Sequence, residues 1–122
     1  MKKILFIEDE AVLQKSLGSL LGEQGYEVIS AIDGESGLNL AKVMKPNLIL
    51  LDLILPRIHG LKILESLKAD EITKDIPVIV LTNLEDNEDI EKALALGATT
   101  YLVKANYNLK DVVEKISKAL ED

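Results

Sequence analysis

The sequence predicts an α/β domain in which five helices cover a five-stranded, mostly parallel sheet. Short apolar runs alternate with helix-spaced apolar residues along all 122 residues. Three of these runs, residues 4–7, 48–51 and 78–81, are apolar without alternation, which is typical of strands covered on both faces. No linker, repeat or low-complexity stretch divides the chain, so we expect residues 1–122 to form one domain.

The first predicted strand, residues 3–7, is too short for a helix and is followed at once by acidic residues. The helix after it is predicted from apolar residues that share one face, Leu13, Leu17, Leu20 and Leu21. Gly25 ends this helix. Residues 26–32 are rich in β-branched and aromatic side chains and predict the second strand.

The second helix is predicted from three apolar residues at helical spacing, Leu38, Ala41 and Met44. It ends at Lys45, because a residue that precedes proline disfavours the α conformation. Residues 47–55 form the most apolar predicted strand, and Asp52 is its only charged residue. The third helix is marked by three leucines, Leu61, Leu64 and Leu67.

Pro77 precedes the fourth predicted strand, residues 78–81, and residues 85–97 follow as a helix that begins with acids and ends with glycine. Residues 100–103 form the fifth strand. The last helix is predicted from an amphipathic set of apolar residues, Leu109, Val112, Val113, Ile116 and Leu120. Five strands in this pattern fit the doubly wound order 2-1-3-4-5, which we adopt from flavodoxin-like folds rather than derive from the residues.

Polar side chains gather at the carboxyl ends of the predicted strands, where an open α/β sheet holds its ligands. Glu8 and Asp9 follow the first strand, and Asp52 lies near the end of the third. Thr82 closes the fourth strand, and Lys104 follows the fifth. In the order 2-1-3-4-5 these strand ends are neighbours, so we expect the five side chains to share one site.

Each of these residues also has an ordinary interpretation. Asp52 could cap a turn, Glu8 and Asp9 could begin a helix, and Thr82 or Lys104 alone means little. However, a carboxylate is rare inside an apolar run unless it is paired or bound to a metal. Three carboxylates in one crevice repel each other unless a divalent cation joins them, and oxygen ligands with room for water and phosphate suit Mg²⁺. A lysine and a hydroxyl could then hold the phosphoryl oxygens.

Composition limits the partners. The net charge of −7, from 21 acidic and 14 basic side chains, disfavours binding to nucleic acid and to anionic membranes. The apolar run near the N-terminus is too short for a signal peptide or a transmembrane helix. The chain has no cysteine, so neither a disulfide framework nor a thiolate metal site is expected. A cytoplasmic protein fits these observations best.

The polar motifs occur in a characteristic order, which is Glu8-Asp9, the segment DLILPRIHG at residues 52–60, Thr82, Tyr101 and Lys104. With them the chain resembles, over its entire length, the response-regulator receiver domains of two-component signalling, of the single-domain type found in chemotaxis regulators. The resemblance implies that Asp52 takes a phosphoryl group from a phosphohistidine of a histidine kinase or phosphotransfer protein. Mg²⁺ would be held by Asp9, Asp52 and the backbone carbonyl of Ile54. Glu8 would act on it through water, and Lys104 would offset the charge of the phosphoryl group.

The resemblance also implies a switch. Thr82 would move to the phosphate and Tyr101 into the space it leaves, which rearranges the partner-binding face formed by the last two helices and the strand between them. The chain stops after the last predicted helix, so we expect a stand-alone regulator that acts on a downstream protein, without a DNA-binding domain. We expect no enzymatic activity beyond its own phosphorylation and dephosphorylation. Thr99 and Thr100 stand where dimer-forming, DNA-binding relatives often have an acidic pair, which favours a monomer.

Four departures from the family pattern affect the site. Ala105 replaces the proline that usually follows the lysine, so a trans peptide is expected there, since a cis bond before a non-proline residue costs about 2.5–4 kcal/mol. His59, where aspartate or asparagine is commoner, is expected to be a partly exposed turn residue. Asn83 is larger than the usual residue and is expected to crowd the phosphate. Ile54 and Leu84 cannot orient a hydrolytic water, so we expect the phosphoryl group to be lost slowly.

Three other functions share parts of this pattern. A flavodoxin-like protein that binds FMN or a nucleotide wants a glycine- or hydroxyl-rich loop after its first strand, whereas residues 8–10 are acidic; bound flavin would show in absorbance. A haloacid-dehalogenase-like phosphatase expects an Asp-x-Asp pair, and neither Asp9 nor Asp52 begins one. A pseudo-receiver would keep the fold and bind partners without phosphorylation, which Ala105 and Asn83 leave open.

Overall fold

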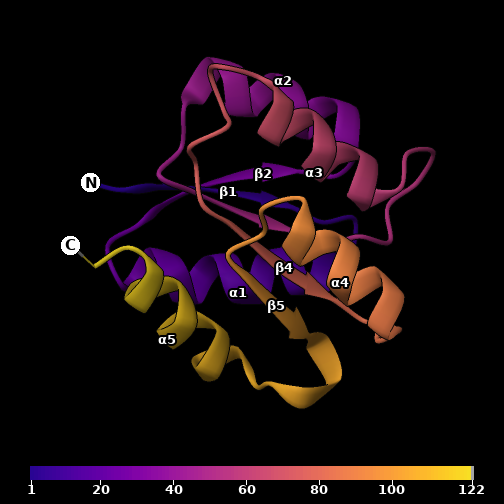
Figure 1. Cartoon of the computed structure of the whole chain (residues 1–122). Helices are drawn as coiled ribbons and strands as arrows, with labels where there is room; N and C mark the ends of the chain where they lie inside the picture. Colours follow the sequence, from indigo (N-terminus) through magenta and orange to yellow (C-terminus); the bar gives the residue numbers. More distant parts are fainter. Residues whose placement is uncertain (122) are drawn as a thin grey trace.

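The structure, a computed structural model that describes residues 1–121, alternates strands and helices along the chain (Figure 1). The strands are β1 Lys3–Ile7, β2 Glu27–Ala31, β3 Leu48–Leu51, β4 Val78–Thr82 and β5 Thr100–Val103. The α-helices are α1 Ala11–Glu23, α2 Gly34–Met44, α3 Gly60–Ala69, α4 Asn87–Ala95 and α5 Leu109–Ala119. A short 3-10 helix, η1 Lys104–Asn106, connects β5 to α5. The predicted sequence of elements is confirmed.

All strand pairings are parallel, and the sheet order is β2-β1-β3-β4-β5, as predicted. Within it, Leu5 of β1 pairs with Ile29 of β2 on one side and with Ile49 of β3 on the other. Helices α1 and α5 cover one face of the sheet, and α2, α3 and α4 cover the other (Figure 1). This topology places the carboxyl ends of β1, β3, β4 and β5 together at one end of the sheet.

Two apolar clusters, one on each face of the sheet, form the core. Along β1, Leu5 and Ile7 belong to the cluster under α2, α3 and α4, whereas Ile4 and Phe6 belong to the cluster under α1 and α5. All four side chains are fully buried. Because both faces of the central strands are covered, these strands are unbroken apolar runs rather than alternating ones, as the sequence predicted.

The strand predicted over residues 47–55 is too long. In the structure β3 ends at Leu51, and Asp52 lies one residue beyond it. The cause is a turn, because the Ile54 amide donates to Asp52 Oδ1 at 3.0 Å and the Gly60 amide donates to the Leu53 carbonyl at 2.9 Å. Asp52 is thus held by the turn that leaves the strand, where its backbone no longer has to pair with both neighbouring strands.

Other boundaries shift by one or two residues. The helix predicted over residues 85–97 runs over Asn87–Ala95, with the extended Asp86 in the N-cap position and Gly97 beyond its end. At Gly97 φ is +110°, a conformation that favours glycine. The helix predicted to end at Lys45 does so, and Lys45 itself takes a left-handed conformation with φ 46° before Pro46. Such differences are normal at element ends.

The start of α3 packs closely against the turn that carries Asp52. A Cβ atom on Gly60 would lie 2.3 Å from Leu53 Cα and 2.7 Å from the Asp52 carbonyl oxygen. His59 precedes it as the exposed N-cap, and its Nδ1 accepts a hydrogen bond from the Leu61 amide at 3.0 Å. His59 was predicted to be a partly exposed turn residue; it also caps α3, which the sequence analysis did not foresee.

Candidate functional site

The carboxyl ends of the strands bring two of the predicted carboxylates, Glu8 and Asp52, onto Lys104. Lys104, directly after β5, places its Nζ 2.9 Å from Glu8 Oε1 and 3.0 Å from Asp52 Oδ2. Glu8 follows β1 and Asp52 follows β3, the two strands at the switch point of the sheet. Asp52 and Glu8 are buried, with side-chain exposures of 4% and 0%, so the ammonium compensates charges that water reaches poorly.

Three carboxylates at this end of the sheet form a candidate metal site. One oxygen each from Glu8, Asp9 and Asp52 lie within 4.8 Å of one another. Asp9 is exposed, so the group opens to solvent on one side. Glu8 Oε1 is buried, and apart from the Lys104 ammonium it has no hydrogen-bonding partner among residues 1–121. An all-oxygen, partly open ligand set in which three carboxylates share one nearby ammonium fits a hard divalent cation that keeps some of its water.

The surroundings shift the pKa values of both Glu8 and Lys104. Burial raises the pKa of Glu8 to about 7; the Asp52 charge raises it further, while the Lys104 ammonium opposes the shift. For Lys104, burial by itself lowers the pKa, but ion pairs with Glu10, Glu8 and Asp52 outweigh it and hold the pKa above its ordinary range. Lys104 therefore remains a cation at every physiological pH, whereas Glu8 gains or loses a proton near neutrality.

Thr82 and Tyr101, the predicted switch residues, meet at the backbone of Leu84. The Thr82 hydroxyl is fully buried and accepts from the Leu84 amide at 3.4 Å, and the Tyr101 hydroxyl donates to the Leu84 carbonyl at 2.8 Å. Burial raises the pKa of Tyr101 to about 12, helped by the charges of Asp89 and Asp52. The phenol is thus a neutral donor whose position depends on the segment that follows Thr82.

Gln14 is a structural part of the site that the sequence analysis missed. Its side-chain amide donates toward the carbonyls of Phe6 at 2.9 Å, Glu8 at 3.1 Å and Ala31 at 3.1 Å. These contacts fasten the carboxyl ends of β1 and β2 beneath Glu8. A signal was available, because residue 14 is in helical register with the buried Leu17 and a polar residue on a buried face needs a partner.

Glu10 was also missed, and nothing in the sequence could pair it with its partner. Its Oε2 lies 2.7 Å from Lys104 Nζ, although the two residues are 94 positions apart. Glu10 occupies the N-cap position of α1, yet its side chain makes no capping hydrogen bond. The acid that would ordinarily begin a helix is used instead to hold the lysine.

The departures from the family pattern have mild structural effects. The peptide before Ala105 is trans, as is every peptide bond in the described chain, and the loop continues as the 3-10 helix η1. The trans bond expected from Ala105 is therefore observed. Asn83 and Ile54 are exposed, so both side chains lie at the outside of the site.

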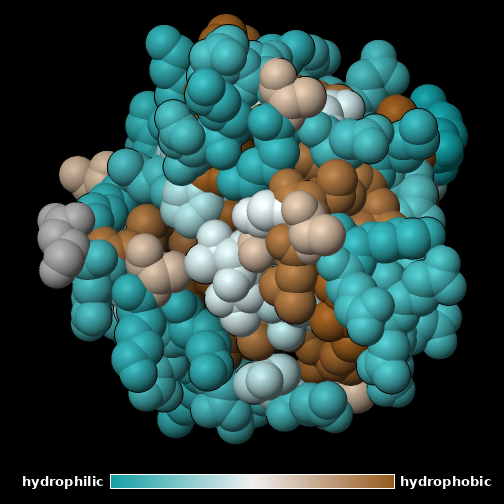
Figure 2. Space-filling model, viewed as in Figure 1, coloured by the Kyte–Doolittle hydropathy of each residue, from teal (hydrophilic) through white to brown (hydrophobic). Residues whose placement is uncertain are grey.

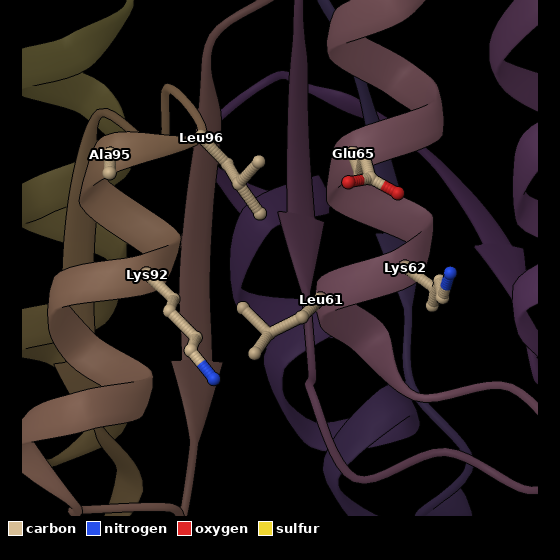
Figure 3. Close-up of a pocket in the computed structure, with 6 residues that line it drawn as sticks. All are labelled: Leu61, Lys62, Glu65, Lys92, Ala95 and Leu96. Carbon is tan, nitrogen blue, oxygen red and sulfur yellow. The ribbon is translucent and has the colours of Figure 1, made fainter.

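A hollow in the surface lies away from the carboxylates, between α3 and α4. It has a volume of about 460 Å³, and its lining residues are Leu61, Lys62, Glu65, Lys92, Ala95 and Leu96. Figure 3 shows Leu61 and Leu96 pointing toward each other across it, and Figure 2 shows apolar surface in the same region. None of the predicted site residues lines this hollow, so it is separate from the candidate site.

Within residues 1–121 no helix combines the length and the apolar character needed to cross a membrane.

Comparisons with known proteins agree with the geometry. The model of the family described as response regulator receiver domain matches residues 4–117. The probable transcriptional regulator ycf27 of Porphyridium aerugineum is 38% identical over 97% of this chain and 50% of its own length. The chain spans about half the length of the curated relatives it matches.

Among the solved structures that share the fold, two examples are more than 30% identical to this chain. The crystal structure of a CheY-like response regulator receiver domain protein from Methanospirillum hungatei JF-1 has a TM-score of 0.90 and 32% identity, covering 98% of this chain and 94% of that one. The Mn²⁺-bound form of response regulator Rcp1 has a TM-score of 0.80 and 31% identity, covering 97% and 91%.

Proposed function

The chain belongs to the response regulator receiver domain family of two-component signalling, and from this premise we propose that Asp52 is its phosphoryl acceptor. The observation that carries the proposal is the Lys104 ammonium 3.0 Å from Asp52 Oδ2, beside carboxylates that can hold a cation. A buried carboxylate poised between an ammonium and a metal site is a nucleophile whose product, an aspartyl phosphate, finds compensating charge already in place.

The donor is a phosphohistidine of a histidine kinase or phosphotransfer protein. An Asp52 oxygen attacks phosphorus, the bond from phosphorus to the imidazole nitrogen breaks, and the imidazole leaves with the electron pair. Lys104 then pairs with a phosphoryl oxygen, and the Thr82 hydroxyl is drawn toward another. When the Thr82 hydroxyl leaves the Leu84 amide, the backbone at Leu84, to which the Tyr101 hydroxyl donates a hydrogen bond, is released. Thr82 and Tyr101 thus both respond to phosphorylation.

We assign the metal as Mg²⁺, held by Asp9, Asp52 and the backbone carbonyl of Ile54, with Glu8 acting through water. The ion, when bound, neutralises phosphoryl charge and aligns the donor with Asp52. The Mn²⁺-bound relative supports a divalent cation in this fold. The close group of three carboxylate oxygens in this chain supports it independently.

For the domain as a whole, we propose a receiver that comprises residues 1–122 and lies in the cytoplasm. Its output is altered protein binding at the face made by α4, β5 and α5, and it catalyses only its own phosphorylation and dephosphorylation. The net charge of −7 supports a protein target for this domain rather than nucleic acid or membrane, and Thr99-Thr100 supports a monomer.

The test is the intact mass of the protein after incubation with a small phosphodonor and Mg²⁺. We expect a gain of one phosphoryl group in the wild type, and in Asp75→Asn, which removes an exposed aspartate elsewhere. Asp52→Asn should gain none, and chelation of Mg²⁺ should abolish the gain in the wild type. A folded wild type that takes no phosphoryl group from several donors would instead support the pseudo-receiver.

The phosphoryl group should also be long-lived. Ile54 is 51% exposed at the mouth of the site, and neither it nor Leu84 can orient water by hydrogen bonding. We expect Ile54→Gln to shorten the lifetime of the aspartyl phosphate severalfold, whereas Ile72→Gln, an equally exposed isoleucine outside the site, should leave it unchanged. Loss of mass with time after donor removal measures this. A wild-type lifetime of seconds would contradict the prediction.

A further inference from the structure

Glu10 lies on the solvent side of Lys104, and its side chain does not serve the helix it precedes, because it makes no capping hydrogen bond to α1. Its side chain is 59% exposed, whereas Lys104 is 13%, Asp52 4% and Glu8 0% exposed. Of the three carboxylates on the ammonium, the exposed one is also the nearest, at 2.7 Å. Glu10 is thus the partner that lies between the lysine and solvent.

A cleft adjoins the ammonium at the mouth of the site. Glu10 and Lys104 are among its lining residues, together with Val12, Asn83 and Ala105, and its volume is about 380 Å³. The backbone of Glu10 is fixed to the site as well, because its amide donates to Glu8 Oε2 at 3.1 Å. The carboxylate is therefore held at the mouth by its backbone and reaches inward to the lysine.

The charges at the mouth are unbalanced. The carboxylates of Glu8, Glu10 and Asp52 contact a single ammonium, and the Asp9 carboxylate lies beside those of Glu8 and Asp52, so an anionic donor meets a predominantly negative site. Lys104 can pair with a phosphoryl oxygen only when one of its carboxylate partners gives way. Glu10 is the partner that can leave most readily, because water can solvate it once it is released.

We propose that Glu10 is a specificity-determining residue that occupies Lys104 until a phosphoryl group displaces it and thereby discriminates against small, highly charged phosphodonors. The inference rests on the proposed function of Asp52. With acetyl phosphate, an Asp52 oxygen forms a bond to phosphorus while the bond from phosphorus to the acetyl oxygen breaks, and acetate leaves with the electron pair. During this step the hydrogen bond that Lys104 donates to Glu10 is replaced by one that it donates to a phosphoryl oxygen.

The experiment compares the phosphorylation rates of four proteins with saturating Mg²⁺, using acetyl phosphate as a dianionic donor and phosphoramidate as a less negative one. Glu10→Gln removes the charge and keeps the shape; Glu10→Asp keeps the charge but shortens the reach. Glu23→Gln, at the other end of α1 and exposed, removes the same unit of net charge away from the site.

We expect Glu10→Gln to be phosphorylated about five- to tenfold faster by acetyl phosphate at low salt, with a smaller gain for phosphoramidate. The gain should shrink as salt is added, because the carboxylate is exposed. Glu10→Asp should lie between Glu10→Gln and the wild type, and Glu23→Gln should match the wild type. A purely structural role for Glu10 would not produce this dependence on donor charge and salt.

Two results overturn the inference in different ways. Glu10 has no specific role if the wild type is phosphorylated and Glu10→Gln reacts at the wild-type rate with each donor. The same conclusion follows if Glu23→Gln is accelerated as much as Glu10→Gln. If the wild type takes no phosphoryl group from either donor while folded, the proposed function fails and the inference with it.

Discussion

Gly60→Ala is expected to lower the free energy of unfolding by about 3 kcal/mol or more. The added Cβ would lie 2.3 Å from Leu53 Cα and 2.7 Å from the Asp52 carbonyl oxygen, and both are backbone atoms that cannot rotate away. Relief requires α3 to move from the turn after β3, which breaks the hydrogen bond from the Gly60 amide to the Leu53 carbonyl. Urea unfolding followed by circular dichroism measures the loss.

The matched control is Gly22→Ala in α1. Apart from the backbone of α1 and the two neighbouring residues, no atom of residues 1–121 lies within 4 Å of a Cβ at that exposed position. The change should therefore raise stability by about 0.5–1 kcal/mol through helix propensity alone. Equal stability of Gly60→Ala and the wild type would mean that α3 does not press on the turn. In that case the turn that holds Asp52 would owe its shape to other contacts.

Lys104→Met is expected to lower the free energy of unfolding by about 3 kcal/mol at about pH 8, because it leaves buried carboxylates without their cation. The loss should be at most about 1 kcal/mol at about pH 5.5, since Glu8 can then take up a proton. Burial raises the pKa of Glu8 from 4.5 to about 7 although the Lys104 ammonium lowers it. Removal of the lysine should therefore raise the pKa of Glu8 further. Because the pKa of Glu8 is higher in the folded state than in the unfolded state, protonation of Glu8 stabilises the fold. This contribution is fully present below pH 4.5 and is lost as the pH rises through about 7.

Millimolar Mg²⁺ should restore more than half of that loss at the higher pH, because a divalent cation supplies the missing positive charge. The control is Lys42→Met, which breaks a surface ion pair with Asp70 at 3.3 Å and should change stability by less than about 1 kcal/mol at either pH. The metal-site assignment would be contradicted by a loss at the higher pH that Mg²⁺ leaves untouched. Urea titrations at both pH values, with and without the ion, decide this.

The fold could be predicted from the sequence because its central strands are covered on both faces. Strand β1 was predicted residue by residue, since Lys3–Ile7 is a short apolar run bounded by acid. The strand through Asp52 was predicted too long, because residues 53–55 are apolar as well and hydrophobicity cannot distinguish a buried turn from a strand. What ends β3 is the hydrogen bond from the Ile54 amide to Asp52 Oδ1, a local competition between side chain and backbone.

The site was predictable where each residue follows a strand, because parallel topology then brings the strand ends together. Glu8 and Asp52 were expected to lie together for this reason, and in the structure both contact Lys104. Glu10 and Gln14 were not, since their roles depend on which way a side chain turns in space. Gln14 is in register with buried leucines, so its polarity was a usable signal, but Glu10 differs from an ordinary helix-starting acid only in its contact with Lys104.

The sheet order has a consequence for which parts of the domain can open. Strands β1, β3 and β4 each pair with a strand on both sides, so their amides should exchange hydrogen with solvent only when the whole domain unfolds. Within residues 1–121, β5 pairs with β4 alone; it is mostly half-buried and can open at a lower free energy. Asp52, the proposed phosphoryl acceptor, thus follows one of the slowest-exchanging strands, while Tyr101 and Lys104 lie in or directly after the more labile edge strand. A local opening of β5 can therefore move Tyr101 and Lys104 while the strand that precedes Asp52 stays folded.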